Sequence, residues 1–248
     1  MATVFIHIPK TAGTTLTELL LKNYQRKKLL HLPQAGQLQA SELSRKAFEN
    51  DCIHGHFRYH DELRIPENFL FTFFRNPLER CLSNFFHFRR EGEWGNASLL
   101  ESAEHFLSDE GLKKNGNWNL QTYFLAWTRG KPFFRNEEDY HLRLAQERLR
   151  QLDLVGITEH FEESVYQLAQ SLAWKKWYYI PHNEGSYSIE KQQVLNHFRK
   201  ELVAANELDL ELYESALEIY GQQKKEIRVP AGKIWKARLL GKLKKSLR

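Results

Sequence analysis

The chain has 248 residues, a formal net charge of +5 and a pI near 9.1, which suits one large α/β domain at residues 1–230 followed by a tail at 231–248. The positive charge indicates an anionic partner, whether a nucleotide, an acidic glycan, a membrane surface or nucleic acid. Two cysteines are too few for a disulfide framework, which favours a reducing compartment. The sequence also has no apolar stretch of transmembrane length, so we expect a cytoplasmic protein or one that has lost a leader.

The predicted elements alternate between strands and helices along the chain. A β-rich run at residues 3–8 leads into a Pro/Gly turn and then into leucines at helical spacing, and a second run at 69–74 is followed by a helix that begins at Pro77. Further strands are predicted at 52–54 and 152–157, and further helices after 157 and over 99–107, 120–127, 142–152 and 208–220. This order predicts a three-layer α/β sandwich with a parallel sheet, whose ligands bind at the carboxyl ends of the strands.

The loop after the first strand, Pro-Lys-Thr-Ala-Gly-Thr-Thr at residues 9–15, has the composition of an anion cradle. We expect Gly13 to provide the turn that lets the backbone approach a phosphate, and Lys10 to add an ammonium group. The alternative is an ordinary strand-to-helix turn with Thr14 as N-cap. The loop is not a Walker A motif because Lys10 precedes the glycine, and no Walker B strand is found, which weighs against a magnesium-dependent kinase or ATPase.

A second anion site is predicted where the run at 69–74 ends. Arg75 offers a forked, permanently charged donor, and Ser83 lies on the helix that follows. The alternative is a surface pair of Arg75 with Glu79, with Ser83 in an ordinary helical turn.

His54 and His56 form a His-Gly-His segment between these two loops. Histidine suits proton removal near neutral pH, so we predict His56 as a general base and His54 as a residue that shares this role or orients the acceptor. A zinc site and a purely structural role are the alternatives; no third ligand stands at a recognisable spacing, so no metal is expected. Of the other histidines, His7 is left unassigned, and residues such as His31, His105 and His141 are expected to be surface or packing residues.

Three motifs carry a resemblance to a known family. Residues 5–15 resemble the 5′-phosphosulfate loop of the Golgi-type carbohydrate sulfotransferases, which include the heparan-sulfate 2-O-sulfotransferases and bacterial relatives. Residues 74–85 are similar to the 3′-phosphate motif of that family, and residues 54–56 to the segment that supplies its base. The resemblance covers residues 3–221 and implies a P-loop NTPase-like topology, with 3′-phosphoadenosine 5′-phosphosulfate as co-substrate and no metal.

The resemblance also implies roles for individual residues. Lys10 would contact the bridging oxygen of the donor, and Asn183 would touch its nucleotide. Asn119 and Gln121 precede the family's acceptor cleft and are predicted to bind the acceptor. The first loop would hold the 5′-phosphosulfate through Lys10, Thr11, Ala12, Gly13, Thr14 and Thr15. The second site would hold the 3′-phosphate through Arg75 and Ser83. Three later carboxylates are expected to be solvated helix residues: Glu162, Glu163 and Asp209.

These motifs predict an enzyme that transfers a sulfuryl group from this donor to a carbohydrate hydroxyl. The alternatives are a sulfotransferase for a lipid or small metabolite, a P-loop-type phosphotransferase, and a non-catalytic binder of anionic glycan or nucleic acid. No recognised nucleic-acid motif occurs, so a nucleic-acid partner is not expected.

The tail from residue 233 to 248 is basic, with Trp235 and several leucines interspersed, and the pattern predicts an amphipathic helix. Such a helix contacts an anionic inner-membrane surface, packs on the domain, or remains solvated. If the tail contacts the membrane, we expect the acceptor to be a lipid-linked glycan.

Overall fold

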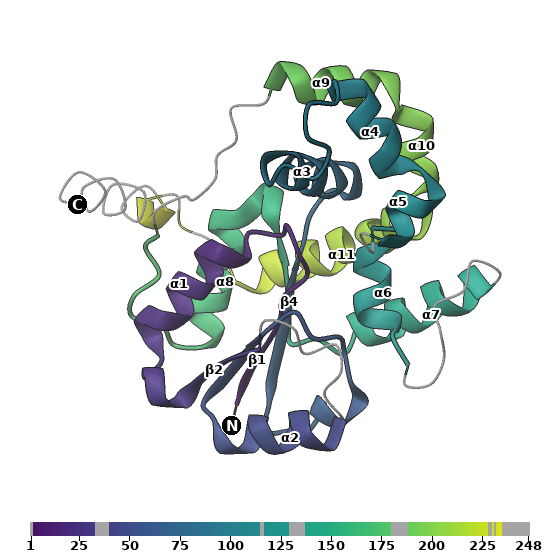
Figure 1. Cartoon of the computed structure of the whole chain (residues 1–248). Helices are drawn as coiled ribbons and strands as arrows, with labels where there is room; N and C mark the ends of the chain where they lie inside the picture. The colour runs from purple at the N-terminus through teal and green to yellow at the C-terminus, as the bar shows by residue number, and fades with distance from the viewer. Residues whose placement is uncertain are drawn as a thin grey trace.

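The computed structural model (Figure 1) describes residues 2–32, 40–114, 117–128, 137–179, 188–227, 230 and 232–234. Among these residues, five strands form one sheet in which every pairing is parallel, in the order β2-β3-β1-β4-β5. Parallel strands need crossover connections, which helices supply here. The strands are β1 (Thr3–Ile6), β2 (Leu29–Leu32), β3 (Cys52–Gly55), β4 (Phe69–Phe74) and β5 (Leu154–Ile157).

The side chains of the strands alternate between two apolar layers, as the two-residue period of a strand requires. In β1, Val4 and Ile6 face one layer and Phe5 faces the other. In β4, Phe71 packs in the second layer, where its ring stacks on Phe5 with centroids 4.7 Å apart. Both faces of the central strands are therefore buried, which explains their nearly continuous apolar sequences.

Helices cover both faces of the sheet (Figure 1). One layer holds α1 (Gly13–Asn23) and α8 (Phe161–Ser171). The other layer holds α2 (Ala40–Glu49), α6 (Leu120–Ala126), α7 (Glu138–Leu149) and α11 (Glu207–Glu226). Short 3₁₀ turns occur at η1 (Arg26–Lys28), η3 (Asp61–Leu63) and η5 (Thr158–His160).

A third group of helices packs around its own apolar cluster beyond the carboxyl ends of the strands (Figure 1). It includes α3, which begins at Pro77 directly after β4 and its two-residue loop. These helices are α3 (Pro77–Arg90), α4 (Leu99–Leu107), α5 (Asp109–Lys114), α9 (Ser188–His197) and α10 (Arg199–Ala204). The group therefore stands over the edge where ligands of parallel sheets bind.

The predicted α/β class with a parallel sheet between helices is confirmed. Several boundaries differ: the first strand ends at Ile6 rather than at residue 8, β5 begins at Leu154 rather than at 152, α7 spans Glu138–Leu149 rather than 142–152, and α11 extends to Glu226. Strand β2 was not predicted, because its four residues alternate too little in polarity to stand out. None of the described helices is long and apolar enough to cross a membrane. Of the predicted tail, only residues 232–234 are described beyond Pro230.

Candidate active site

The three predicted motifs meet at the carboxyl edge of the sheet. Strand β1 lies between β3 and β4, so the loops that follow these three strands are neighbours. From β1 the chain crosses to β2 on one side, whereas from β4 it crosses to β5 on the other side. Ligands of open α/β sheets bind where the direction of the connections reverses in this way.

The first loop is shaped by two residues with left-handed backbone geometry, Lys10 (φ 70°) and Ala12 (φ 65°). Thr11 is fully buried, and its hydroxyl donates to the carbonyl oxygen of Ile8 at 2.8 Å. The N-cap of α1 is Ala12, whose methyl group cannot accept a hydrogen bond from the first amides of the helix. These amides and the positive end of the helix dipole are therefore left for an anion.

The threonines of this loop differ in what they offer an anion. Thr14 is exposed in the first turn of α1, so both its hydroxyl and its amide are accessible. Thr15 is nearly buried, and the hydroxyl of Thr11 is used inside the loop. The predicted phosphate contact of the Thr11 side chain is therefore corrected: this side chain holds the shape of the loop.

The prediction for Gly13 is also corrected. Its backbone does not make the left-handed turn; Lys10 and Ala12 do. Instead, Gly13 is buried against the imidazole of His7, and a Cβ atom at this position would lie 1.7 Å from Nε2 of His7. The glycine is needed because the ring of His7 occupies the space of a side chain.

We expect Gly13→Ala to lower the unfolding free energy by about 1–3 kcal/mol, because the new methyl group overlaps the ring of His7. At Gly221 in α11 no atom lies within 4 Å of an added Cβ. The matched control Gly221→Ala should therefore stabilise the protein by about 0.5–1 kcal/mol through helix propensity. Denaturant unfolding measures both changes. The double variant His7→Ala/Gly13→Ala should recover stability relative to Gly13→Ala; no recovery would contradict the overlap.

The second loop is held in place by the side-chain amide of Gln121. Its Oε1 accepts from the backbone amide of Arg75, and its Nε2 donates to the carbonyl oxygen of Arg75, both at 3.0 Å. Asn76 caps α3 by accepting from the amide of Glu79 at 3.2 Å. The guanidinium of Arg75 then donates to the carbonyl oxygen of Lys10 at 3.3 Å and lies 3.6 Å from the carboxylate of Glu79. The two predicted anion loops are thus joined directly.

Asn119 and Gln121 do not face an acceptor, which corrects both predictions. Gln121 is fully buried and serves Arg75, as described. Asn119 is 1% exposed, and its Oδ1 accepts from the amides of Leu208 and Asp209 at the start of α11. Both side chains therefore set the position of the second loop from behind.

Asp209, which was expected to be solvated, is fully buried instead. Its carboxylate accepts from the amide of Gln121 at 3.0 Å, and from both the amide and the hydroxyl of Thr122 at 2.7 and 2.8 Å. Burial raises the pKa of Asp209, and the charge of Arg80 and these hydrogen bonds oppose that rise. Asp209 thus fixes the start of α6, from which Gln121 holds Arg75.

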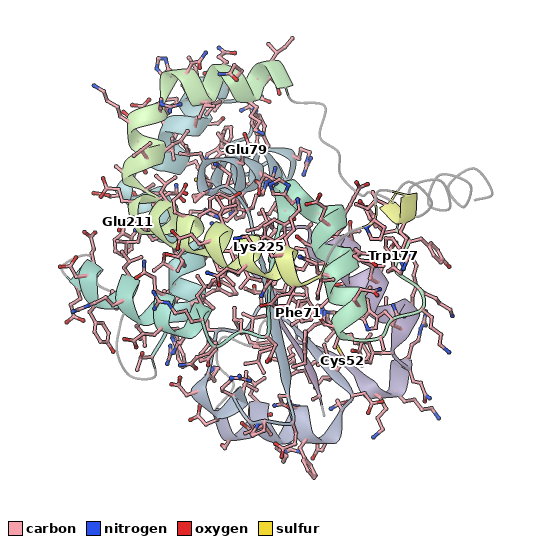
Figure 2. All side chains as sticks on the ribbon, turned by 180° about the vertical axis from the view of Figure 1, so that it is seen from behind. Cys52, Phe71, Glu79, Trp177, Glu211 and Lys225 are labelled. Atoms are coloured by element: carbon pink, nitrogen blue, oxygen red, sulfur yellow. The ribbon has the colours of Figure 1, made fainter. Side chains whose placement is uncertain are left out.

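Replacing Asp209 with alanine should lower the unfolding free energy by about 3–5 kcal/mol, because it leaves buried amides without an acceptor and removes a negative charge that offsets the charge of buried Arg80. Glu211, two residues later on the same helix, is exposed (Figure 2). The control Glu211→Ala should change stability by less than about 0.5 kcal/mol. Equal effects of both substitutions in denaturant unfolding would refute the role of Asp209.

Lys10 lies among positive charges. Burial, and after it the charges of three arginines, together lower its pKa to about 8: Arg90, Arg75 and Arg80. A bound anion would offset the repulsion among these cations.

The face of α3 that carries Ser83 is turned toward this loop. Ser83 is half-buried, and His87 and Arg90 follow it at helical spacings of four and three residues. The charge of Lys10 lowers the pKa of His87 after burial, which is the larger cause. The helical spacing of His87 and Arg90 from Ser83 could have indicated these two residues, although only Ser83 was predicted.

Four histidines gather beside the first loop. The rings of His7 and His56 meet edge to face with centroids 4.4 Å apart, and Nδ1 of His31 lies 3.4 Å from Nδ1 of His54. Burial, and after it the charges of neighbouring histidines, lower the pKa of His54 to about 4 and that of His7 to about 3. Burial and then the charge of His31 also lower the pKa of His56. All three imidazoles are therefore neutral near pH 7, and His7 and His54 are weak bases.

The two predicted histidines have different surroundings. His56 is exposed, whereas His54 is 1% exposed and packs on His31. Burial keeps His54 away from an acceptor, which corrects the expectation for this residue. His31 is exposed and packs on His54, which agrees with its expected role as a surface or packing residue. Within the described residues no group of three or more His, Cys, Asp or Glu side chains is placed to hold a metal ion. The predicted nucleotide contact Asn183 lies outside the described residues.

Comparison with known proteins adds one finding. The sequence model of a protein family described as the sulfotransferase family matches residues 2–222, which include both anion loops and the four histidines. A search among curated proteins found no significant match.

Proposed function

Because the chain belongs to the sulfotransferase family, we propose that it transfers a sulfuryl group from 3′-phosphoadenosine 5′-phosphosulfate to a carbohydrate hydroxyl, with His56 as general base. The contact that carries this proposal is the one between Arg75 and the carbonyl oxygen of Lys10, because it joins two cationic loops beside an exposed neutral histidine. A donor with phosphate groups at the 3′ and 5′ positions of one ribose requires two such neighbouring sites.

In the proposed donor site, the amides at the start of α1 and the hydroxyl of Thr14 bind the 5′-phosphosulfate. Arg75 and Ser83 bind the 3′-phosphate. The 5′-phosphosulfate and the 3′-phosphate suit this site because Lys10 and Arg75 supply neighbouring positive charges. The charge of Arg90 is also close enough to lower the pKa of Lys10. Hydrogen bonds to charged groups contribute about 1.5–3 kcal/mol each, so these residues suffice for strong recognition.

In the proposed reaction, the acceptor oxygen attacks the sulfur atom, and the bond from sulfur to the bridging phosphate oxygen breaks. His56 takes the proton of the attacking hydroxyl through an imidazole nitrogen. Protonated Lys10 stabilises the charge that develops on the departing phosphate. A sulfuryl group carries less negative charge than a phosphoryl group, so the proposal needs no metal ion.

The acceptor side of the proposal rests on residues next to His56. Along residues 56–59, exposed and buried side chains alternate, so Arg58 lies on the same side of the chain as His56. The guanidinium of Arg58 lies over the rings of Tyr123 and Trp127, 4.6 and 5.4 Å from their centroids. Aromatic faces with a cation suit a sugar that carries acidic groups.

The pH dependence of kcat/KM should have two limbs. Activity should fall below pH 6.5, because His56 acts only when neutral and burial places its pKa below the ordinary 6.5. Activity should also fall as the pH rises through about 8, because Lys10 then loses its proton. The limb at high pH should move further up in kcat, since a bound anionic donor raises the pKa of Lys10. Initial-rate measurements over pH 5–10 decide this; a rate that keeps rising above pH 9 would contradict it.

The activity itself is tested by incubating the protein with this donor and a panel of acidic and neutral oligosaccharides, and by detecting the sulfated product by mass spectrometry. We expect transfer without added magnesium. If only lipids or small metabolites were sulfated, the acceptor would belong to one of these classes and not to the carbohydrates. Phosphorylation from ATP in the presence of magnesium, without sulfation, would overturn the proposal.

A further inference from the structure

A cationic and aromatic surface lies beside the end of α1, on the side of the sheet that α1 and α8 cover. We call it the basic face and define it by residues 21–28 and 172–179. The two segments are in contact: the side-chain amide of Asn23 donates to the carbonyl oxygen of Lys176 at 2.7 Å, and the ammonium of Lys22 to that of Tyr178 at 3.1 Å. Both segments are rich in lysine and arginine and contain no aspartate or glutamate; the cations are Lys22, Arg26, Lys27, Lys28, Lys175 and Lys176.

Most of these charges face solvent. All but Lys22 are exposed, and Lys22 lies 4.0 Å from the carboxylate of Glu18 one turn earlier in α1. Apolar groups lie among the charges: Leu21 is 44% exposed, and Trp177 is half-buried. A hollow of about 350 Å³ opens within the face and is lined in part by Trp174. Cations mixed with aromatic and aliphatic side chains are typical of surfaces that lie at a lipid headgroup layer.

The carboxyl-terminal tail starts beside the basic face. Lys233 donates to the hydroxyl of Tyr166 at 3.4 Å, and the ring of Tyr166 packs edge-on against Trp177 with centroids 5.4 Å apart. Figure 2 shows Trp177 on the side of the molecule where residues 232–234 lie. The sequence then continues through residues 235–248 with six further lysines and arginines and no acidic residue. The sequence of the tail is therefore basic, like that of the basic face.

We propose that the basic face docks the protein on an anionic lipid bilayer. Each lysine or arginine near such a surface contributes about 1 kcal/mol. A hydrated polyanion would not bury the exposed side chain of Leu21, whereas the headgroup boundary does. This favours lipid over an anionic polymer as the partner.

Docking in this way leaves the candidate active site free. Helix α1 begins at the donor loop and ends at the basic face, and its 11 residues separate the two by about 16 Å. The proposal is independent of the chemistry, because charges on the basic face lie outside the donor site.

The test is co-sedimentation of the full chain with vesicles of phosphatidylcholine, with and without 30% phosphatidylglycerol. The variant Lys27→Glu/Lys28→Glu/Lys175→Glu/Lys176→Glu reverses four exposed charges of the basic face. At about 1 kcal/mol per charge, its partition onto anionic vesicles should fall by at least about 100-fold. The control Arg199→Glu/Lys200→Glu reverses two exposed charges on α10, on another side of the molecule (Figure 1), and should reduce binding far less.

Three outcomes would overturn the proposal. The first is equal binding to vesicles with and without phosphatidylglycerol. The second is a loss of vesicle binding that is as large per reversed charge in Arg199→Glu/Lys200→Glu as in the basic-face variant, because generic charge would then explain both losses. The third is salt-sensitive binding to heparin without binding to anionic vesicles, which would assign the face to an anionic polymer. Sulfuryl transfer to a water-soluble acceptor should be unchanged in the basic-face variant, so failure of the docking proposal remains distinguishable from failure of the proposed activity.

Discussion

His56→Ala should lower kcat by about 10²–10⁴, the usual loss when a general base is removed. Affinity for the donor should hardly change, because the proposed donor site consists of the first loop, Arg75 and Ser83. His56 is exposed, so the substitution removes no core packing and the variant should fold. Steady-state rates at saturating donor, together with calorimetric binding of the donor product, separate the two effects.

His105→Ala is the matched control, since His105 is also exposed but lies on α4, outside the cluster of four histidines. Its kcat should equal that of the unaltered protein. If His56→Ala kept full activity while His105→Ala did too, a different group would be the base. A fall in kcat that came with an equal fall in donor affinity would place His56 in the donor site instead.

Replacing Lys10 should lower kcat by about 10²–10³, as expected for the loss of one preorganised charge at a leaving group. Lys10→Gly is the better variant, because Lys10 has left-handed backbone geometry, which glycine adopts without strain. The thermal midpoint of this variant should be unchanged or higher while its kcat falls. The limb of the pH profile near pH 8 should disappear with it.

Lys200→Ala, at an exposed position of α10, controls for the loss of a positive charge in general. The role of Lys10 in catalysis would be rejected if Lys10→Gly retained kcat, or if its activity still fell near pH 8. A fall in activity that is matched by a lower thermal midpoint would instead show that Lys10 acts through the fold.

The parts of the site that the sequence predicted are local in the chain. The first loop, Arg75 and the histidine pair each directly follow a β-rich run, so strand periodicity alone predicts that they meet at one edge of a parallel sheet. The apolar strands β1 and β4 could be predicted for the same reason: they are buried on both faces.

The remaining parts depend on contacts between distant segments, which periodicity does not contain. Asp209 and Gln121 are far apart in the sequence, yet together they fix Arg75 from behind. Gly13 was predicted to serve a turn, whereas its actual partner is the ring of His7 on the preceding strand end. A buried aspartate and a solvated one look alike in a single sequence; only the packing of α6 against α11 distinguishes them.

Calorimetric titration with 3′-phosphoadenosine 5′-phosphate, compared with ADP, tests whether the protein has a site for a donor with both a 3′-phosphate and a 5′-phosphate. The unaltered protein should prefer the first ligand by at least about tenfold, because Arg75 adds a charged hydrogen bond to the 3′-phosphate. Arg75→Ala should abolish this preference while leaving weak binding of both. Equal affinity of the unaltered protein for the two nucleotides, or no binding of either, would contradict the account.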